Sequence, residues 1–402
     1  MASPTPAQPP QAAGPLQPEP PQPEALRGPG ARRVARIARA LAPLPLPHAA
    51  GSAAAEPLPA PSPIPSIDVS SLFGADPDAK MRTAREIASA CEEIGFFSIT
   101  NHGVPMETIA AAWEQTQAFF SEDQETKALG TDMSDDYPYG YLPLGGEKLS
   151  AGKSHELGKE EAAEEPPGDL NESFSIGPIT EAGGAPPAKW PTAPTGFKQA
   201  WSQYYEAMET LSAGLLGAFA LALDLPEDWF KDKIDRHRCA LRTLNYPELS
   251  PSDPVLADAG QLRASAHTDY GTLTLLLQGI DGEAHEGNGL QVMAGDGRSG
   301  GWRDVPYTPG SFVVNLGDLM SRWTNTRWVS TLHRVVMPSA ERPGSLARRQ
   351  SMAFFHNVNP DQVVECIPSC TGADDPPRFP PIVSGDFLLE KHLASTGGGK
   401  TE

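Results

Sequence analysis

Short apolar runs separated by Gly, Pro and Asp dominate the second half of the chain. Each run is a few residues long and rich in Val, Leu, Phe and Thr, which is the pattern of buried β-strands. The runs are CALRTLNY, GTLTLLLQ, GLQVMAG, GSFVVNLGD, RWVSTLHRVV and RRQSMAFFHNV, all between residues 239 and 358. Many short strands in series predict a sandwich or barrel rather than a parallel α/β sheet.

Helical patterns are confined to the part of the chain that precedes these strands. The segment AKMRTAREIASACEEIGF (79–96) has helical composition and ends at a glycine, and FFSITNHGV follows it as a strand and a turn. The longest helical candidate is 197–223, whose second half is apolar enough to be buried. We therefore predict a mainly β fold with flanking helices.

The first 65 residues differ in composition from the rest of the chain. They hold 18 of the 43 prolines, with much alanine and few aromatic residues. Such a segment cannot bury enough apolar surface to fold. We therefore predict that residues 1–62 are disordered. We also predict that the protein is cytoplasmic. Within this segment ARRVARIARALAPL (31–44) is basic and free of acidic residues, and organelle targeting is the alternative for it.

Removal of residues 1–60 is expected to leave folding and activity nearly intact, because no hydrophobic pattern in this segment builds a core. A thermal melt should place the shortened and full-length chains within about 2 °C of each other, the shift that ~1 kcal/mol causes in a large domain. A large loss of thermal stability on truncation would show that the segment packs against the folded part.

Net charge restricts the class of partner. The formal net charge is −20, so a nucleic-acid backbone or an anionic membrane would repel the protein. No apolar stretch approaches the ~20 residues needed to span a bilayer. We expect a small-molecule substrate, no nucleic-acid partner, no membrane partner and a monomeric state.

Candidate metal ligands lie in the stretch SAHTDYGTLTLLLQ (265–278) and in a later predicted strand. His267 and Asp269 are one residue apart and come just before an apolar, β-rich run. Side chains at i and i+2 of a strand leave the same face. If the extended conformation reaches back to His267, both donors point into one pocket. The predicted strand RWVSTLHRVV supplies a third donor, His333.

Two histidines and one carboxylate leave coordination positions open on one side of a metal, as in non-haem Fe(II) oxygenases. Catalytic Zn(II), with three protein ligands and one open position, also fits this set, and a surface histidine beside a solvated aspartate gives the same short pattern. Arg349 and Ser351 favour iron, since they share one face of a strand after His333. An arginine fork with a neighbouring hydroxyl can hold the carboxylate of an organic acid; a surface ion pair is the alternative for Arg349.

Several motifs in order, from about Ile64 to Leu393, resemble the isopenicillin N synthase-like family of Fe(II) and 2-oxoglutarate-dependent dioxygenases. They are GFFSITNHGV, DLNESFSIGP, LNYP, HTDYG, GLQV, NLGDLMSRWTN, STLHRV and the triplet RQS. The resemblance implies a double-stranded β-helix (jelly roll, cupin-like) with iron at one mouth of the barrel. It divides the chain into an N-terminal region with helices (63–235), a jelly-roll core (236–360) and a C-terminal extension (361–402).

The same resemblance assigns roles to individual residues. The implied iron ligands, which form the catalytic centre, are His267, Asp269 and His333. The implied 2-oxoglutarate site comprises Arg349 and Ser351 as the clamp for the distal carboxylate, with Tyr246 and Asn245 lining the pocket. Glu172 and Phe174 lie where members of the family often border the substrate.

One departure from the family pattern affects the clamp. His333 and Arg349 are sixteen positions apart, a longer connection than many plant members have, so we expect an extended hairpin between their strands. Arg348 and Arg342 are therefore rival clamps, although the RxS register favours Arg349.

The resemblance implies an oxidoreductase, a non-haem iron dioxygenase that uses Fe(II), 2-oxoglutarate and O₂, with ascorbate as a stimulant. It would decarboxylate 2-oxoglutarate to succinate and CO₂ and hydroxylate a small organic substrate; desaturation or ring closure uses the same chemistry. One alternative is a 2-oxoglutarate-independent oxidase of the same fold, of the isopenicillin N synthase or ethylene-forming type, and another is a non-catalytic jelly-roll binding protein. The fold does not identify the substrate.

Overall fold

A computed structural model describes residues 64–133, 139–147, 149, 168–179, 187–257, 261–280, 289–294, 301–338 and 346–396. The segment predicted to be disordered (1–62), with its basic stretch, and the rival clamp Arg342 lie outside these residues. Within them no helix is both long and apolar enough to cross a membrane.

Two β-sheets carry the fold in the described part of the chain. The large sheet has eight strands in the spatial order β1 (Ser66–Asp68), β2 (Phe96–Thr100), β10 (Phe312–Leu316), β7 (Leu273–Leu277), β12 (Arg349–His356), β5 (Ala240–Tyr246), β4 (Glu172–Ile176) and β3 (Gly140–Leu142). The small sheet has the order β6 (Ala264–His267), β11 (His333–Val335), β8 (Leu290–Met293) and β9 (Trp302–Asp304). All neighbouring strands are antiparallel except β1 and β2.

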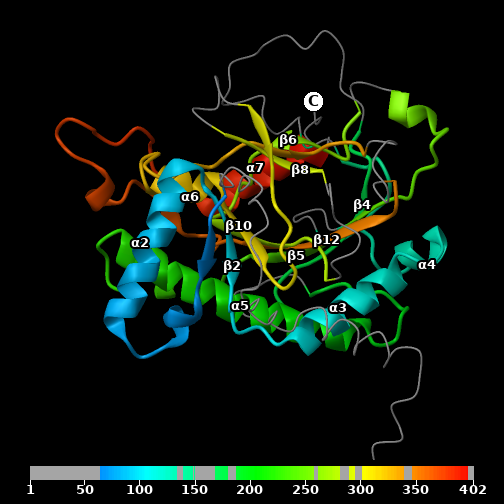
Figure 1. Cartoon of the computed structure of the whole chain (residues 1–402), viewed down its shortest axis with the longest axis horizontal. Coiled ribbons are helices and arrows are strands. Elements are labelled where there is room, and N and C mark those ends of the chain that lie inside the picture. Colours follow the sequence, from blue (N-terminus) through cyan, green and yellow to red (C-terminus); the bar gives the residue numbers. More distant parts are fainter. Residues whose placement is uncertain are drawn as a thin grey trace, which may run out of the picture.

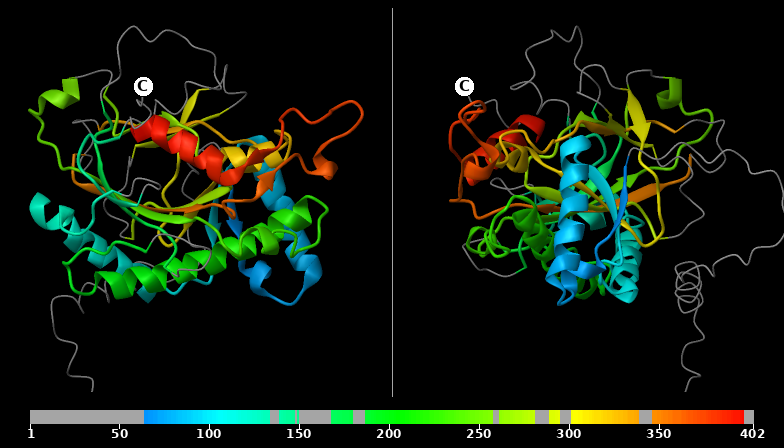
Figure 2. Two further views of the ribbon diagram at one scale, coloured as in Figure 1. Left: turned by 180° about the vertical axis from the view of Figure 1, so that it is seen from behind. Right: turned by 60° about the vertical axis from the view of Figure 1, so that its left-hand side comes forward.

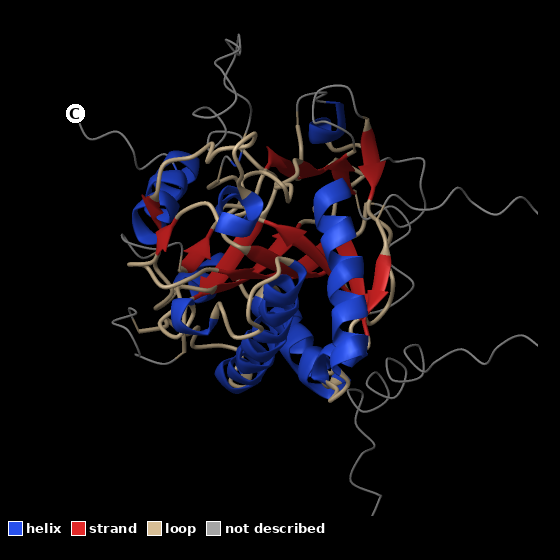
Figure 3. Ribbon diagram, turned by 90° about the vertical axis from the view of Figure 1, so that its left-hand side faces the viewer, coloured by secondary structure: helices blue, strands red, loops and turns tan. Residues whose placement is uncertain are grey.

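The helices that precede β5 in the chain cover the outer face of the large sheet (Figures 1 and 3). The helices of the described chain are α2 (Pro77–Glu93), α3 (Met106–Phe119), α4 (Gln124–Ala128), α5 (Phe197–Ala222), α6 (Asp318–Trp323) and α7 (Ser384–Thr396), with short 3₁₀ turns at Ser70–Phe73, Lys231–Lys233, Pro254–Ala257 and Pro368–Cys370. The two predicted helices are present as α2 and α5. A two-stranded ribbon of β13 (Val363–Val364) and β14 (Ile382–Val383) precedes α7.

Strand alternation divides the apolar residues into two cores. The larger core joins the helices to the outer face of the large sheet, with Trp201 of α5 and Phe354 of β12 among its members. The smaller core lies between the two sheets and contains Phe96 of β2 and Val292 of β8. The predicted mainly β fold with flanking helices is confirmed as a jelly roll whose two sheets face each other without closing into a barrel.

Helix α7 lies on the opposite side of the large sheet from α5, close to the small sheet (Figure 2). The chain therefore returns after its last long strand to cover the space between the two sheets. Nothing in the pattern of the C-terminal extension predicted this position, because helix periodicity gives a buried face but not the element that buries it.

Two glycines allow the chain to cross from the small sheet to the large one between β6 and β7. A Cβ atom on Gly317 would overlap the carbonyl oxygen of Gly271, and one on Gly271 would lie 2.6 Å from that of His356. Real Cβ atoms do not approach backbone atoms this closely. Both positions therefore require glycine because of close backbone approach.

Gly317→Ala is expected to lower the free energy of unfolding by about 1–3 kcal/mol, the usual effect of overpacking a tight site. The same change should weaken metal binding, because the next amide, of Asp318, donates to the Asp269 carbonyl at 2.8 Å. Chemical denaturation and Fe(II) titration measure the two effects. Gly372→Ala is the control, since its added Cβ would meet no atom within 4 Å; equal stability of the two variants would contradict the argument.

Candidate active site

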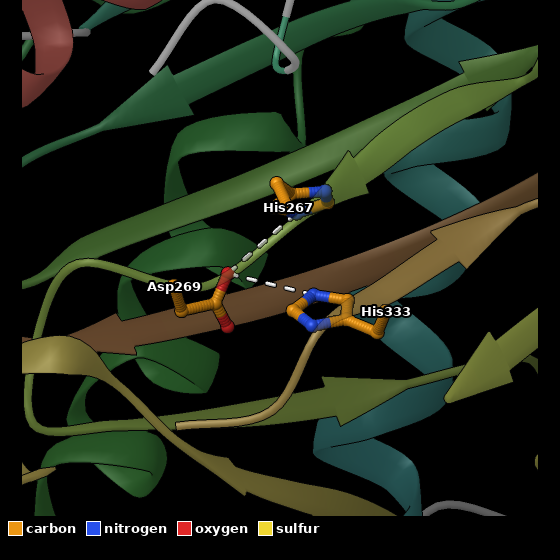
Figure 4. A group of neighbouring side chains, drawn as sticks. All are labelled: His267, Asp269 and His333. Atoms are coloured by element: carbon orange, nitrogen blue, oxygen red, sulfur yellow. Dashed lines mark ion pairs between the residues drawn. The ribbon is translucent and has the colours of Figure 1, made fainter. Parts of the chain in front are cut away.

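Three metal-type donors converge between the two sheets. His267 ends β6 and His333 begins β11, and the two are direct partners across the antiparallel ladder, with ring centroids 4.3 Å apart. The Oδ1 atom of Asp269 lies 3.7 Å from His267 Nε2 and 3.6 Å from His333 Nε2. Figure 4 shows the three side chains pointing toward one another. Among the described residues this is the only group of three such donors that could hold a metal ion.

Backbone carbonyls orient both imidazole rings. The Nδ1 atom of His267 donates to the Ser265 carbonyl at 2.7 Å, and that of His333 donates to the Thr331 carbonyl at 3.1 Å. A proton on Nδ1 leaves the lone pair on Nε2, which faces the centre of the group. Hydrogen bonds of this kind hold the rings of metal-binding histidines in place.

One oxygen of the Asp269 carboxylate faces the two histidines, and the other accepts hydrogen bonds from neighbouring side chains. Its Oδ2 accepts hydrogen bonds from Thr274 Oγ1 and, at 2.6 Å, from Asn315 Nδ2. Burial alone would raise the pKa of Asp269, but His333, His267 and these hydrogen bonds together lower it below the ordinary value. The group is therefore ionised at neutral pH and suited to a cation.

The condition that the strand of the apolar run extends back to His267 is not met. Strand β6 ends at His267, and β7 begins only at Leu273. The intervening residues turn from the small sheet to the large one, and the carboxylate reaches the centre because Thr274 and Asn315 of the large sheet hold it there. The two side chains still meet, but through a turn at the corner of the jelly roll rather than through strand alternation.

A cavity of about 180 Å³ extends from the three donors along the inner face of the large sheet. Strand β12 contributes its odd-numbered residues to the lining, and β5 contributes its even-numbered residues. From one end to the other these are Arg349, Ser351, Ala353 and Phe355 of β12, paired with Tyr246, Leu244, Arg242 and Ala240 of β5. The period-two alternation of strands thus builds two parallel rows of lining residues.

One end of the cavity holds an arginine that has no anionic partner within the described ranges of the chain. Arg349 is 4% exposed, and its Nε and Nη1 atoms have no hydrogen-bond partner in the described part of the chain. Its guanidinium lies 4.7 Å from the ring centre of Tyr246, and the Ser351 hydroxyl lies two residues along the same strand face. Burial lowers the pKa of Arg349, the direction expected for a cation without a counter-charge. Buried polar groups are normally paired, so this end fits a carboxylate ligand.

Known proteins that resemble this chain are iron- and 2-oxoglutarate-dependent enzymes, in agreement with the donors and the arginine of the cavity. Residues 64–193 match the N-terminal model of the non-haem dioxygenase in morphine synthesis, and residues 239–358 match the 2OG-Fe(II) oxygenase superfamily. The 2-oxoglutarate-Fe(II) type oxidoreductase hxnY of Emericella nidulans is 33% identical over 341 residues, which cover 83% of this chain and 90% of that protein. The chain belongs to the 2-oxoglutarate-Fe(II) oxygenase superfamily.

Solved structures of other 2-oxoglutarate-Fe(II) oxygenases have the same fold. A full-length Neurospora crassa protein, solved in complex with alpha-KG, matches with a TM-score of 0.70 and 30% identity, covering 82% of this chain and 96% of that one. A 2OG-Fe(II) oxygenase family protein of Caulobacter crescentus matches with a TM-score of 0.67 and 30% identity, covering 83% and 99%. The resemblance read from the motifs is confirmed, and so is the assignment of the protein as an oxygenase.

Two residues of this oxygenase predicted near the co-substrate and substrate lie on the other face of the large sheet. The amide of Asn245 donates to Glu172 at 2.8 Å and accepts from Arg348 at 2.6 Å. Glu172 also pairs with Lys127 at 2.7 Å. The structure thus corrects the placement of Asn245 in the pocket, and it turns the rival clamp Arg348 away from the cavity.

The expectation that Glu172 and Phe174 border the substrate is wrong, because their side chains lie on the face of the sheet away from the cavity. Adjacent strand residues face opposite sides, so the intervening Ser173 and the following Ser175 lie on the cavity side of the sheet, and Ser175 lines the cavity. Phe174 is fully buried among the aromatic residues of the helices. A sequence motif identifies the strand to which a residue belongs. Only the register of that strand shows on which face of the sheet the side chain lies.

Sequence reasoning missed the far end of the cavity. Arg242 of β5 donates from Nη1 to Glu147 Oε1 at 3.0 Å and from Nη2 to Glu147 Oε2 at 2.5 Å. Residues of α7, including Leu388 and His392, close this end. Alternation along CALRTLNY could have placed Arg242 on the same face as Tyr246. No pattern indicated Glu147 or α7, because a loop and a C-terminal helix supply them.

Proposed function

We propose that this oxygenase holds Fe(II) with His267, Asp269 and His333 and uses it to hydroxylate a small organic molecule. The distal carboxylate of 2-oxoglutarate would bind Arg349 and Ser351, with Tyr246 beside it. The observation that carries the proposal is the combination, in one cavity, of three convergent donors and a buried guanidinium with two nitrogens that have no hydrogen-bond partner among the described residues.

The donor set fits the metal on chemical grounds. Two imidazole nitrogens and one carboxylate suit non-haem Fe(II), and the arginine at the end of the cavity favours iron with an organic acid over a hydrolytic zinc site. When bound, the metal and 2-oxoglutarate would supply the oxidising chemistry, while the protein supplies placement and shielding. Thr274 and Asn315 would fix Asp269, and apolar residues such as Leu276 and Val335 would limit access of water.

Relatives support a small organic substrate. The Neurospora crassa protein has also been solved with thymine and alpha-KG, and a relative in Petromyces alliaceus, 27% identical, is named a proline hydroxylase. We propose hydroxylation as the outcome, with O₂ as co-substrate and ascorbate as a stimulant. The net charge of −20 supports a protein without nucleic-acid or membrane partners, and we propose that it acts as a monomer.

A screen for succinate formation tests the proposal. Candidate small molecules are incubated with the protein, Fe(II), ascorbate and 2-oxoglutarate under air. The expected result is succinate in a molar amount matching an oxygenated product, with both depending on the substrate. Product formation and O₂ consumption without succinate would instead establish the 2-oxoglutarate-independent oxidase.

A further inference from the structure

The cavity has a second arginine at the end away from the proposed clamp. Arg242 lies opposite Ala353, four residues along β12 from Arg349. At ~3.3 Å per residue this separation is about 13 Å. The clamp and Arg242 are therefore distinct positions on one sheet face, and 2-oxoglutarate bound at Arg349 leaves the Arg242 end for the substrate.

A carboxylate neutralises this second arginine. The two bonds between Arg242 and Glu147 form a bidentate pair, and Ser173 Oγ accepts a third bond from the guanidinium at 2.8 Å. The side chain of Arg242 is 12% exposed and that of Glu147 is 4% exposed. Buried ion pairs are seldom more stabilising than apolar side chains of similar size. Stability alone therefore does not account for this pair in the cavity wall.

The neighbours of the pair include one imidazole that is neutral at neutral pH and one guanidinium that is directed at backbone carbonyls. Burial, with a contribution from Arg242, lowers the pKa of His392 on α7 to about 4, which keeps that imidazole neutral. The Nη1 atom of Arg238, which also reaches the cavity, is directed at the backbone carbonyls of Arg236 and His237, at 3.5 and 3.4 Å. Phe355 and Leu388 supply apolar walls beside these groups.

We propose that the Arg242–Glu147 pair is the recognition surface for the prime substrate, and that Glu147 excludes organic acids from it. The substrate class is an apolar, ring-like molecule with an uncharged amide or imide edge. Such an edge offers a donor to the Glu147 carboxylate and an acceptor to its neighbours, whereas an acid would meet the negative charge of Glu147 and a guanidinium whose two terminal nitrogens already bond that carboxylate. The inference rests on the proposed function, which places 2-oxoglutarate at Arg349.

Exclusion of acids from the Arg242 end would also keep the co-substrate from binding there. 2-Oxoglutarate is a dicarboxylate that must always be present, and an unpaired Arg242 would offer it a second site in the same cavity. Glu147 prevents this competition because it occupies the guanidinium with a carboxylate of the protein. Removing the charge of Glu147 should therefore open the substrate end to acids.

Calorimetric titration with benzamide and benzoate tests the inference, since these probes share one ring and differ in charge. The full-length protein is loaded with Fe(II) and 2-oxoglutarate without O₂. Wild type is expected to bind benzamide at least ~10-fold more tightly than benzoate, and Glu147→Gln to shift this ratio at least ~10-fold toward benzoate. Glu147→Gln should also bind two molecules of 2-oxoglutarate where wild type binds one.

Two further variants keep the test decisive. Glu248→Gln makes the same charge change at an exposed position and should retain the wild-type ratio. The double variant Arg242→Met with Glu147→Met removes both charges and leaves no stranded ion. Because the hydrogen bonds to the amide are lost with them, it should bind benzamide at least ~10-fold more weakly than wild type. This double variant decides the question if Glu147→Gln fails to fold.

The inference is overturned if wild type binds benzoate as tightly as benzamide, if neither probe binds, or if the double variant binds benzamide as tightly as wild type. These outcomes concern binding alone. Failure of the proposed function would appear separately, as absence of succinate in an enzyme that still distinguishes the two probes.

Discussion

His333→Ala is expected to abolish turnover and stoichiometric iron binding. His333 supplies one of three converging donors, and its Nε2 lies 3.6 Å from Asp269 Oδ1. Loss of a residue that merely supports a metal ligand costs 10- to 100-fold in affinity, so loss of a ligand should weaken Fe(II) by at least ~100-fold. Asp269→Ala and His267→Ala are expected to behave in the same way. Anaerobic Fe(II) titration and succinate formation measure the two effects.

A histidine outside the cavity provides the control for this experiment. His237 is bonded to Glu209 at 2.8 Å and does not contribute to the cavity lining. His237→Gln should keep one Fe(II) per chain and measurable turnover. Full activity in His333→Ala would disprove the assignment of the metal site.

Arg349→Lys is expected to weaken 2-oxoglutarate by at least ~10-fold while Fe(II) binding stays unchanged. Lysine keeps the charge but loses the planar fork that grips a carboxylate with two bonds. A hydrogen bond to a charged group is worth about 1.5–3 kcal/mol, and each ~1.4 kcal/mol is tenfold in affinity. The effect should be large because Arg349 is buried and no side chain of the described chain replaces the missing bond. Titration of 2-oxoglutarate against the Fe(II)-loaded protein gives the ratio.

Arg348→Lys is the matched control, because Arg348 immediately precedes β12 and its side chain points away from the cavity. Its guanidinium donates to Asn245 and to Ser121 rather than into the cavity, so the affinity for 2-oxoglutarate should change little. A larger effect in Arg348→Lys than in Arg349→Lys would show that the register of the clamp is wrong. If Arg349→Lys impaired only the prime substrate and succinate never formed, the oxidase alternative would replace the oxygenase.

The sequence was sufficient where the chemistry follows strand alternation. Arg349 and Ser351 face the cavity because they are two positions apart on one strand, and this relation holds wherever the strand lies. His333 could be placed on a strand because its run RWVSTLHRVV has the composition of a strand. The helix over 197–223 was equally accessible, because its apolar pattern is long and regular.

The sequence was insufficient where two elements must be placed relative to each other. The turn after His267 was not predicted, since the HTDYG motif does not show that the chain changes sheets there. The family resemblance placed Asn245 in the pocket together with Tyr246, although adjacent strand residues face opposite sides. Glu147 and His392 could not be found at all, since their position depends on a loop and a terminal helix that pack across the cavity.

An anaerobic titration of the Fe(II)-loaded protein with 2-oxoglutarate, followed by visible absorption, tests the central claim most directly. A 2-keto acid that chelates Fe(II) gives a charge-transfer absorption, so the reading reports the metal and the co-substrate together. We predict an absorption that saturates at one 2-oxoglutarate per iron, is absent in His333→Ala and requires at least ~10-fold more 2-oxoglutarate in Arg349→Lys. Stoichiometric Fe(II) binding in wild type with no absorption at any concentration of 2-oxoglutarate would contradict the account.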